Sequence, residues 1–313
     1  MSRRAWRRAG TGAGVVAVGL AATVVAAGAT LKAQARIARR IIGKPLGEEA
    51  LAADRVYKKK YGDPIDLLLL GDSIAAGLGA DDPGNTLGGE LARRLTKETR
   101  RAVRLHTAAV VGAETSGLPD QLASLEPGYR ADVAVIVVGG NDITHRVRVV
   151  DSRRQLGEAI GALRAEGVEV VVGTCPDLGA LRPLPQPLRS LGARASRQLA
   201  AAQREVTTEL GGRAVSLAEV VGPFFITQPD EMFALDRFHP SGAGYRRTAK
   251  AMLPSVLAAL GYADSVPFGH HPPDASVTGA EKVREPMQPR SRPGRRPLAT
   301  GSVGSMLRHL RIR

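Results

Sequence analysis

The sequence of 313 residues contains a single cysteine, Cys175, and only 4% aromatic side chains. One thiol excludes an intramolecular disulfide and any zinc centre built from several cysteines. A free cysteine at the end of an apolar run is usually a small buried side chain, so we assign Cys175 no role. With 43% hydrophobic residues, the chain can still form one sizeable core.

Acidic residues are absent from the first 40 positions, which hold eight Lys or Arg residues, and residues 264–313 hold nine basic against four acidic residues. Residues 41–263 carry 27 basic and 26 acidic side chains, so the net charge of +14 belongs almost entirely to the two ends. A nearly neutral middle offers no basic face for a phosphate backbone, and we expect no nucleic-acid partner.

Charge is also missing from the stretch Gly10–Leu31, which follows four arginines. Its 22 residues would span about 33 Å as a helix, enough to cross a bilayer. The triplets "AGA" ending at Ala29 and "AQA" ending at Ala35 are similar to signal-peptidase sites, so a cleaved export signal and a retained membrane anchor both remain open. Residues 1–40 therefore predict an export signal or transmembrane anchor, and a protein of the cell envelope that is membrane-anchored or secreted.

The rest of the chain divides where the composition changes. Residues 41–65 predict a spacer helix with a charged end, and residues 66–262 predict one folded domain. Residues 263–313 are rich in Pro, Gly, Ser and Arg and predict a basic, disordered tail. Two adjacent histidines in that tail, His270 and His271, fall short of a metal-ligand set.

Short apolar runs alternate with helical stretches from residue 66 onward. Runs such as "DVAVIVVGG" are almost continuously apolar, which is typical of strands covered on both faces in a parallel sheet. The alternation predicts an α/β protein with a three-layer αβα sandwich. The expected strands cover residues 66–71, 103–110, 132–140, 168–174 and 213–218.

Residues whose side chains or backbone could take part in catalysis follow these strands. In an open parallel sheet the carboxyl ends of the strands lie at one edge, where ligands bind. Ser73 follows the first strand, Gly112 the second and Asn141 the third, whereas Asp236 and His239 come after the fifth. This set suits acyl transfer, with Ser73 as nucleophile, His239 as its base and Asp236 holding the imidazole. The backbone N–H groups of Ser73 and Gly112 and the side-chain amide of Asn141 are candidate oxyanion donors.

Each of these residues also has an ordinary structural explanation. Ser73 can cap the helix that follows it, Asn141 and Asp142 can form a turn, and His239 can be a surface side chain. Four such coincidences on one edge would be needed together, so we favour a catalytic site.

Four short blocks carry a family resemblance: "GDSIAAG" at 71–77, the glycine at 112, "GGND" at 139–142 and "DRFHP" at 236–240. In this order they resemble the SGNH subgroup of the GDSL esterases and lipases, and the chain is similar to exported, actinobacterial-type members. The resemblance spans roughly residues 66–262. The second block departs from the common pattern, because Ala113 follows the glycine where the family usually has aspartate; the backbone donor is unaffected.

The resemblance implies a flavodoxin-like fold with a five-stranded parallel sheet of order 2-1-3-4-5, and ester hydrolysis without a metal or an organic cofactor. It also implies that Ser73, Gly112, Asn141 and His239 are the four residues that give the subgroup its name, and that Asp236 completes the triad. The substrate would be a small-molecule or lipid ester.

Two long connections at the predicted functional edge, residues 175–192 and 221–238, are expected to shape substrate choice. The second contains Phe224, Phe225 and Phe233, which are candidates for an acyl pocket, although core packing explains them equally well. The function predicted is a serine ester hydrolase with an acyl-Ser73 intermediate. Acyl transfer or thioester cleavage at the same site, and a non-catalytic binding protein with basic tails, remain alternatives.

Overall fold

The computed structural model describes residues 28–37, 40, 43, 45–47 and 49–274. Most of the predicted export segment, and the tail beyond residue 274, lie outside the described residues.

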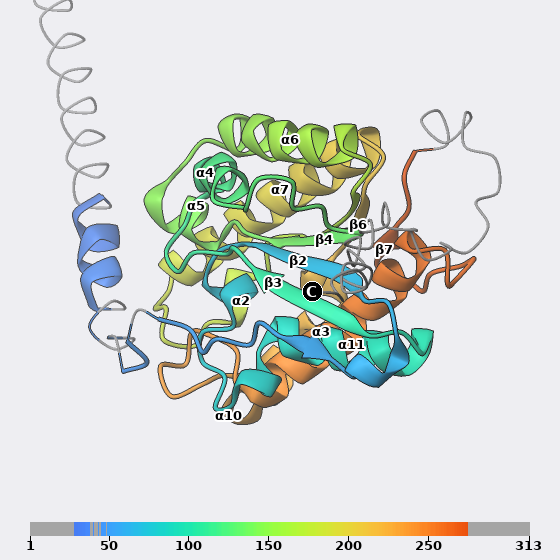
Figure 1. Ribbon diagram of the computed structural model, residues 1–313. Coiled ribbons are helices and arrows are strands. Elements are labelled where there is room, and N and C mark those ends of the chain that lie inside the picture. The colour runs from blue at the N-terminus through green and yellow to red at the C-terminus, as the bar shows by residue number, and fades with distance from the viewer. Residues whose placement is uncertain (1–27, 38–39, 41–42, 44, 48, 275–313) are drawn as a thin grey trace, which may run out of the picture.

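A seven-stranded sheet forms the middle layer (Figure 1). Its order is β1-β3-β2-β4-β5-β6-β7, and the two edge strands, β1 and β7, run antiparallel to their neighbours. The sheet is therefore mixed, and the expected five-stranded, wholly parallel sheet is incomplete at both edges. The strands are β1 (Val56–Tyr57), β2 (Ile65–Gly71), β3 (Val103–Thr107), β4 (Val133–Val137), β5 (Glu169–Gly173), β6 (Arg213–Val215) and β7 (His270–His271).

Helices cover both faces of the sheet. Figure 1 shows α4, α6 and α7 on one side and α3 and α11 on the other. The long helices are α3 (Leu87–Thr99), α6 (Val149–Ala165), α7 (Leu188–Glu209) and α11 (Gly242–Ala259). The short ones are α2 (Ser73–Ala76), α4 (Leu118–Ala123), α5 (Gly140–His145), α8 (Leu217–Val220), α9 (Gly222–Thr227) and α10 (Pro229–Met232). Single 3-10 turns lie at η1 (Lys59–Tyr61), η2 (Pro83–Asn85), η3 (Thr115–Gly117) and η4 (Leu178–Ala180).

The central strand β2 shows why the sequence has four leucines in a row. Leu67 and Leu69 pack into the core under α3 and α11, whereas Leu68 and Leu70 pack into the core under α4 and α6. Successive side chains of a strand point to opposite faces, so a strand covered on both sides needs an apolar residue at every position. The two cores are thus separated by the sheet itself.

The segment before β2 differs from the sequence-based expectation. The spacer helix expected over residues 41–65 is absent from the described part of that range, where Val56–Tyr57 instead forms the edge strand β1. Ala53 and Tyr57 are buried, and the Tyr57 hydroxyl donates to the Ala53 carbonyl. Pairing with β3, rather than the local charge pattern, decides the conformation here. The folded domain therefore begins about ten residues earlier than predicted.

The chain after α11 also differs from expectation. Residues 264–274 are described, and His270–His271 pairs with β6 as the edge strand β7, so the predicted disordered tail does not begin at residue 263. His270 Nδ1 lies 2.7 Å from the Ser255 hydroxyl, and His271 Nε2 lies 2.9 Å from the Ser216 hydroxyl. Both histidines are thus engaged in holding this edge strand.

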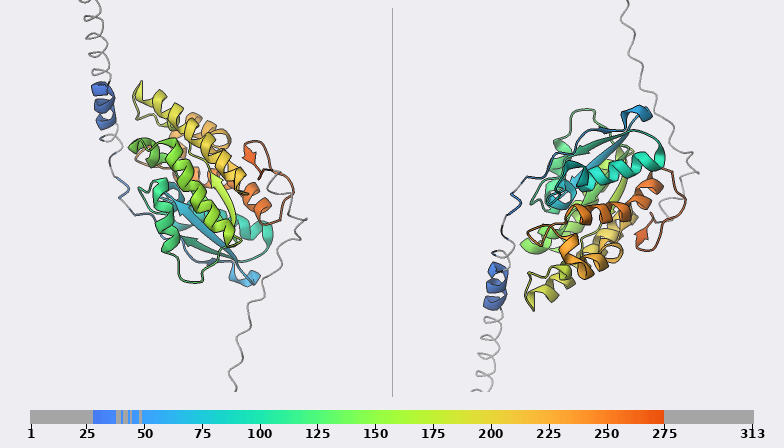
Figure 2. Two further views of the ribbon diagram at one scale, coloured as in Figure 1. Left: turned by 90° about the horizontal axis from the view of Figure 1, so that it is seen from above. Right: turned by 90° about the horizontal axis from the view of Figure 1, so that it is seen from below.

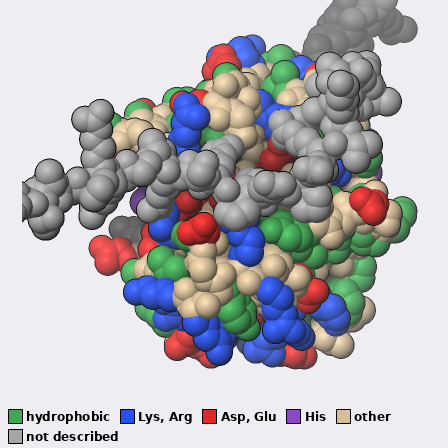
Figure 3. All heavy atoms as spheres, turned by 45° about the vertical axis from the view of Figure 1, so that its right-hand side comes forward, with side chains coloured by type: hydrophobic (Ala, Val, Ile, Leu, Met, Phe, Trp, Pro, Cys, Tyr) green, Lys and Arg blue, Asp and Glu red, His purple; other side chains and the backbone are tan. Residues whose placement is uncertain are grey.

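The surface of the domain mixes charges of both signs. On the face shown in Figure 3, Lys and Arg side chains are interspersed with Asp and Glu. At the other end of the described chain, residues 28–37 are helical. None of the helices within the described residues combines the length and the apolar character needed to cross a membrane.

Candidate active site

Ser73 lies at the turn between β2 and α2, at the carboxyl edge of the sheet. Asp72 has an extended backbone, and its side chain accepts a hydrogen bond from the Ile74 N–H at 2.9 Å, which starts the helix directly at Ser73. Gly77, at φ 91°, ends this helix after a single turn. The hydroxyl of Ser73 is therefore presented at a short, tightly capped turn.

Gly71, at the end of β2, is the point where only glycine fits. Its φ is +127°, and a Cβ there would lie 1.9 Å from the Val137 carbonyl oxygen. The buried side chain of Gln121 forms a pair of hydrogen bonds with the backbone N–H and C=O of Gly71. Gln121 Oε1 accepts from the Gly71 N–H and its Nε2 donates to the Gly71 carbonyl, both at 2.8 Å. The backbone leading into the Ser73 turn is thus held from both sides.

Ser73, His239 and Asp236 form one chain of hydrogen bonds. Ser73 Oγ lies 2.9 Å from His239 Nε2, and His239 Nδ1 lies 2.5 Å from Asp236 Oδ2. The other carboxylate oxygen of Asp236 accepts from the backbone N–H groups of Phe238 and His239, each at 3.0 Å. Burial raises the pKa of Asp236, but the hydrogen bonds from the His239 ring and these two N–H groups outweigh it, so the pKa lies below its usual value. An ionised Asp236 suits an imidazole that must accept a proton at Nε2.

The loop that carries His239 is closed on itself and pressed against the Ser73 turn. The Ala234 N–H donates to the His239 carbonyl at 2.8 Å, and Phe233 forms a β-bridge with Pro240. Gly79, just after α2, lies so near this loop that a Cβ on it would be 2.5 Å from the Pro240 carbonyl oxygen. Close backbone contact therefore fixes the distance between Ser73 and His239, which are far apart in the sequence.

Gly112 lies on the loop after β3, and Asn141 lies in the first turn of α5, after β4, so the two residues follow the strands that flank β2. One N–H of the Asn141 amide donates to the Ala113 carbonyl at 2.9 Å, which joins the two segments. Among the described residues, the backbone N–H groups of Ser73 and Gly112 have no hydrogen-bond acceptor. Gly112 has φ +83°, and a Cβ there would meet no atom within 4 Å, so there is open space beside its Cα.

Asp142 holds this part of the site in place. It is fully buried, and its two carboxylate oxygens accept from the Thr115 N–H at 3.0 Å and from the Ser152 hydroxyl at 2.6 Å. The contact to Thr115 fixes the loop that contains Gly112 relative to α5, which carries Asn141.

Asp72 is the second buried carboxylate of the site. Burial raises its pKa from an ordinary 3.8 to about 6, against the opposing effects of the Ile74 N–H, the nearby His239 and the Gly140 N–H. Cys175 lies close by and is fully buried, which raises the pKa of its thiol well above the usual value. Cys175, with an inaccessible and protonated thiol, is therefore not a nucleophile.

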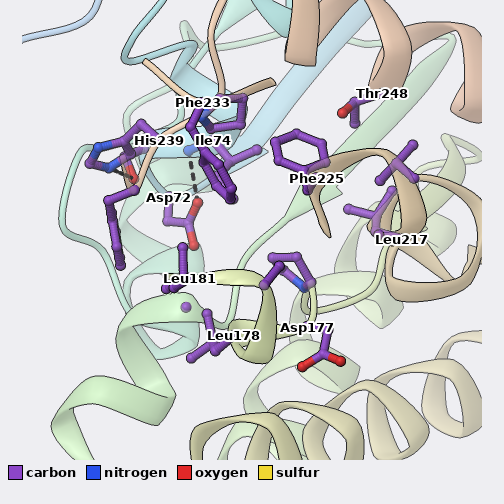
Figure 4. Close-up of a pocket in the computed structure, with 18 of the residues that line it drawn as sticks. Asp72, Ile74, Asp177, Leu178, Leu181, Leu217, Phe225, Phe233, His239 and Thr248 are labelled. Carbon is purple, nitrogen blue, oxygen red and sulfur yellow. Dashed lines mark hydrogen bonds between the residues drawn. The ribbon is translucent and has the colours of Figure 1, made fainter. Parts of the chain in front are cut away.

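An apolar pocket opens beside Ser73 and His239 (Figure 4). Phe225 and Phe233 line it and meet edge to face with ring centroids 4.9 Å apart. Phe224 is not among its lining residues, because its ring faces the other way, 3.5 Å from the Arg247 guanidinium. Further apolar lining comes from Ile74, Pro176, Leu178, Ala180, Leu181, Leu217, Val221, Phe238 and Pro240. No group of three or more His, Cys, Asp or Glu side chains within the described ranges is placed to hold a metal ion.

The comparison with known families settles the kind of protein. A family model described as the GDSL-like Lipase/Acylhydrolase family matches residues 69–247. The chain belongs to the GDSL-like lipase/acylhydrolase family. This acylhydrolase is therefore a hydrolase acting on ester bonds, as the motifs predicted.

Individual relatives agree with this assignment. The acylhydrolase is 36% identical over 253 residues to the GDSL-like esterase Rv1075c of Mycobacterium tuberculosis, covering 77% of this chain and 80% of that protein. It is similar in fold to the lipase/acylhydrolase from Enterococcus faecalis, with a TM-score of 0.51 and 22% identity over 62% of this chain and 95% of that one. A structure of TesA gives a TM-score of 0.50 and 25% identity over 62% of this chain and 99% of that chain.

Three buried polar residues support the backbone of the acylhydrolase site and were not predicted to do so from the sequence: Gln121, Asp142 and Gln203. Gln203 accepts from the Cys175 N–H at 2.7 Å and donates to the Val138 carbonyl at 2.9 Å, so it joins the ends of β4 and β5 as Gln121 holds the end of β2. Each glutamine lies on the buried face of its helix, one turn after a buried leucine: Gln121 after Leu118 and Gln203 after Leu199. A polar residue at an apolar stripe position was the signal that could have revealed them.

Proposed function

We propose that this protein hydrolyses carboxylic esters through an acyl-Ser73 intermediate. The observation that carries the proposal is the hydrogen-bonded chain from Ser73 through His239 to Asp236 at the mouth of an apolar pocket. In that chain the imidazole accepts at one nitrogen and donates at the other, as a general base must.

Acylation starts when Ser73 Oγ attacks the ester carbonyl carbon and His239 Nε2 takes the hydroxyl proton. The tetrahedral intermediate collapses by breaking the bond to the alcohol oxygen, which receives that proton from His239 and leaves. Water then attacks the acyl carbon while His239 Nε2 takes one of its protons. The second tetrahedral intermediate collapses by breaking the bond to Ser73 Oγ, which receives that proton, and the carboxylic acid leaves. Asp236 keeps the ring in one orientation and stabilises the imidazolium that forms in each step.

The negative oxygen of each intermediate would be bound by the N–H groups of Ser73 and Gly112 and by the second N–H of the Asn141 amide. The first amide N–H donates to Ala113, so Asn141 can reach the oxyanion only with its remaining donor. Donors that are already in place before the reaction lower the barrier without further reorganisation.

The acyl group would occupy the apolar pocket. In Figure 4 its labelled side chains extend from His239 and Asp72 at one end to Leu217 and Thr248 at the other. An apolar channel that leads away from the nucleophile suits a hydrocarbon chain better than a sugar or a charged acid.

The test is hydrolysis of p-nitrophenyl esters by wild-type protein and by the Ser73→Ala variant, with labelling by a fluorophosphonate probe. We expect the substitution to lower kcat/KM by about four orders of magnitude and to abolish labelling. Ser116→Ala, at an exposed serine of the same edge, is the matched control and should change neither. An active Ser73→Ala protein would overturn the mechanism, and salt-dependent DNA binding with no labelling of Ser73 would favour a non-catalytic binder.

We also propose that the protein works in the cell envelope, held at or exported across the membrane by residues 1–40. The uncharged stretch Gly10–Leu31 behind four arginines supports this location. Fractionation of producing cells tests it: recovery in the membrane or outside the cell is expected, and recovery only in the cytosol would refute it.

A further inference from the structure

The edge of the sheet that carries Ser73 exposes several large apolar side chains. Val110 follows β3, Leu191 lies in the first turn of α7, Ile226 lies on α9 and Leu235 lies in the loop of His239. Their exposed fractions are 54%, 48%, 52% and 86%, respectively. We call these four residues the apolar rim. Single exposed apolar residues are ordinary, but several of them on the edge of the sheet that carries the pocket indicate a binding surface.

Two residues of the apolar rim are close in sequence to residues that line the pocket. Ile226 follows Phe225 directly, and Leu235 lies between Phe233 and the catalytic loop residues, so two rim residues adjoin two pocket-lining rings. The Arg182 guanidinium donates to the Ile226 carbonyl at 3.4 Å, which joins the two long connections at the pocket mouth. Leu191, Ile226 and Leu235 thus lie on the two connections, residues 175–192 and 221–238, that supply much of the pocket lining.

Exposed arginines accompany the rim. Arg146 ends α5, Arg182 precedes the pocket mouth and Arg237 lies between Asp236 and His239; none of them has an acidic partner among the described residues. Of the acidic residues here, Glu114 is paired with His145 at 2.7 Å, whereas Asp230 and Glu231 on α10 are exposed. Free guanidinium groups around an apolar surface suit an anionic interface.

The N-terminal helix is attached at the same edge. Gln34 Nε2 donates to the Gln186 carbonyl at 2.6 Å, and its Oε1 accepts from the Leu188 N–H at 3.3 Å, just before α7. Both views of Figure 2 show this helix beside the beginning of α7 and away from β7. This helix, residues 28–37, contains the last four residues of the uncharged stretch Gly10–Leu31.

We propose that the catalytic edge docks on an anionic lipid bilayer, and that the substrate is a fatty-acyl ester drawn from that bilayer into the apolar pocket. The proposal rests on the ester hydrolysis proposed above and adds the physical form of the substrate. The rim side chains enter the boundary between headgroups and acyl chains, while Arg146, Arg182 and Arg237 meet the anionic headgroups. The acyl chain then passes from bilayer to pocket without crossing water.

The test compares two substrates with the full-length protein. One is p-nitrophenyl butyrate in solution, and the other is a fluorogenic long-chain acyl ester embedded in phosphatidylcholine vesicles, with or without phosphatidylglycerol. The variant is the double substitution Leu235→Glu and Ile226→Glu, at two exposed side chains that do not line the pocket. The matched control is Phe268→Glu, because Phe268 is 85% exposed but lies beside β7, far from α2 in Figure 1.

We expect the double variant to lose about tenfold or more of its turnover of the vesicle-bound ester while its activity on the soluble ester stays within about twofold. Phe268→Glu should change neither activity. Wild-type turnover should rise by about fivefold when phosphatidylglycerol is added.

Three results would overturn the docking proposal: unchanged vesicle turnover in the double variant, an equal loss in Phe268→Glu, or equal wild-type rates on neutral and anionic vesicles. Each of these would leave the acyl-Ser73 mechanism standing, provided that wild-type protein hydrolyses the soluble ester. A wild-type protein inactive on both substrates would instead refute the proposed hydrolysis.

Discussion

Replacing the carboxyl group of Asp72 by an amide should change how the stability of the protein depends on pH. Asp72 is buried, and its pKa is raised from 3.8 to about 6. A carboxyl whose pKa is higher in the folded than in the unfolded protein favours folding while it is protonated. That contribution is fully present below about pH 4 and is lost as the pH rises through 6.

The size of the effect follows from the two pKa values. The rise from 3.8 to about 6 corresponds to a total of about 3 kcal/mol in the free energy of unfolding. About 2 kcal/mol of this falls between pH 4.5 and pH 7, a range that can be measured. The Asp72→Asn variant has no such titration. The unfolding free energy of wild type minus that of the variant should therefore fall by about 2 kcal/mol over this range.

The assay is urea unfolding of both proteins at a series of pH values. The amide of the Asp72→Asn variant also places N–H atoms against the Gly140 N–H, which lowers the unfolding free energy of the variant by an amount that does not depend on pH. The test is therefore how the difference in unfolding free energy between the two proteins changes with pH. Asp230→Asn, at an exposed carboxylate, is the matched control. A difference that stays constant from pH 4.5 to 7, or that grows with pH, would refute the reasoning.

Three further substitutions test the parts of the site. Asn141→Ala should lower kcat by about 100- to 1000-fold with little change in KM, since it removes an oxyanion donor, and a loss below about tenfold in steady-state assays would contradict that role. Gln121→Leu should lower the unfolding free energy by about 1–3 kcal/mol in denaturant titrations, because it leaves the buried Gly71 N–H without an acceptor; an unchanged midpoint would show that the Gly71 contact is unimportant. Leu217→Phe at the end of the pocket should move the preference toward shorter acyl chains in a series of p-nitrophenyl esters, and an unchanged chain-length profile would place the acyl group elsewhere.

Much of the chemistry could be predicted because it depends on local rules. The residues just past the ends of parallel strands must share one edge, so Ser73 and Asn141 could be assigned to a common site from the strand pattern. The structure brings them together with Gly112, Asp236 and His239 at that edge. This level of prediction needs no knowledge of side-chain packing.

Other features depend on contacts between distant parts of the chain. The edge strands β1 and β7 have two residues each, too few for any periodicity, and their conformation comes from pairing with β3 and β6. The sequence also could not decide which phenylalanine side chains line the pocket. Phe224 and Phe225 are neighbours on a helix and so point about 100° apart, which means that only one of them can face the pocket. Composition could indicate a cluster, but only the packing of α9 selects Phe225.

The order of the strands accounts for the remaining geometry of the site. β2 lies between β3 and β4, with Leu69 opposite Thr107 and Gly71 opposite Val137, so the segments that carry Gly112 and Asn141 flank the Ser73 turn on its two sides. The proposed oxyanion donors thus lie on the segments next to the proposed nucleophile because of the hydrogen-bonded strand pairing.

Strand pairing does not place His239 next to Ser73, because His239 follows β6, which is separated from β2 by β4 and β5. The chain reaches Ser73 only by crossing the edge of the sheet through α8, α9 and α10, and it is fixed there by tertiary contacts. Pro240 lies against Gly79, and the Tyr245 hydroxyl at the start of α11 donates to the Leu78 carbonyl at 2.6 Å. The positions of Ser73 and of the proposed oxyanion donors therefore follow from the sheet, whereas the position of His239, the proposed base, depends on how α11 packs. Changes that loosen α11 should impair proton transfer before they disturb the oxyanion site.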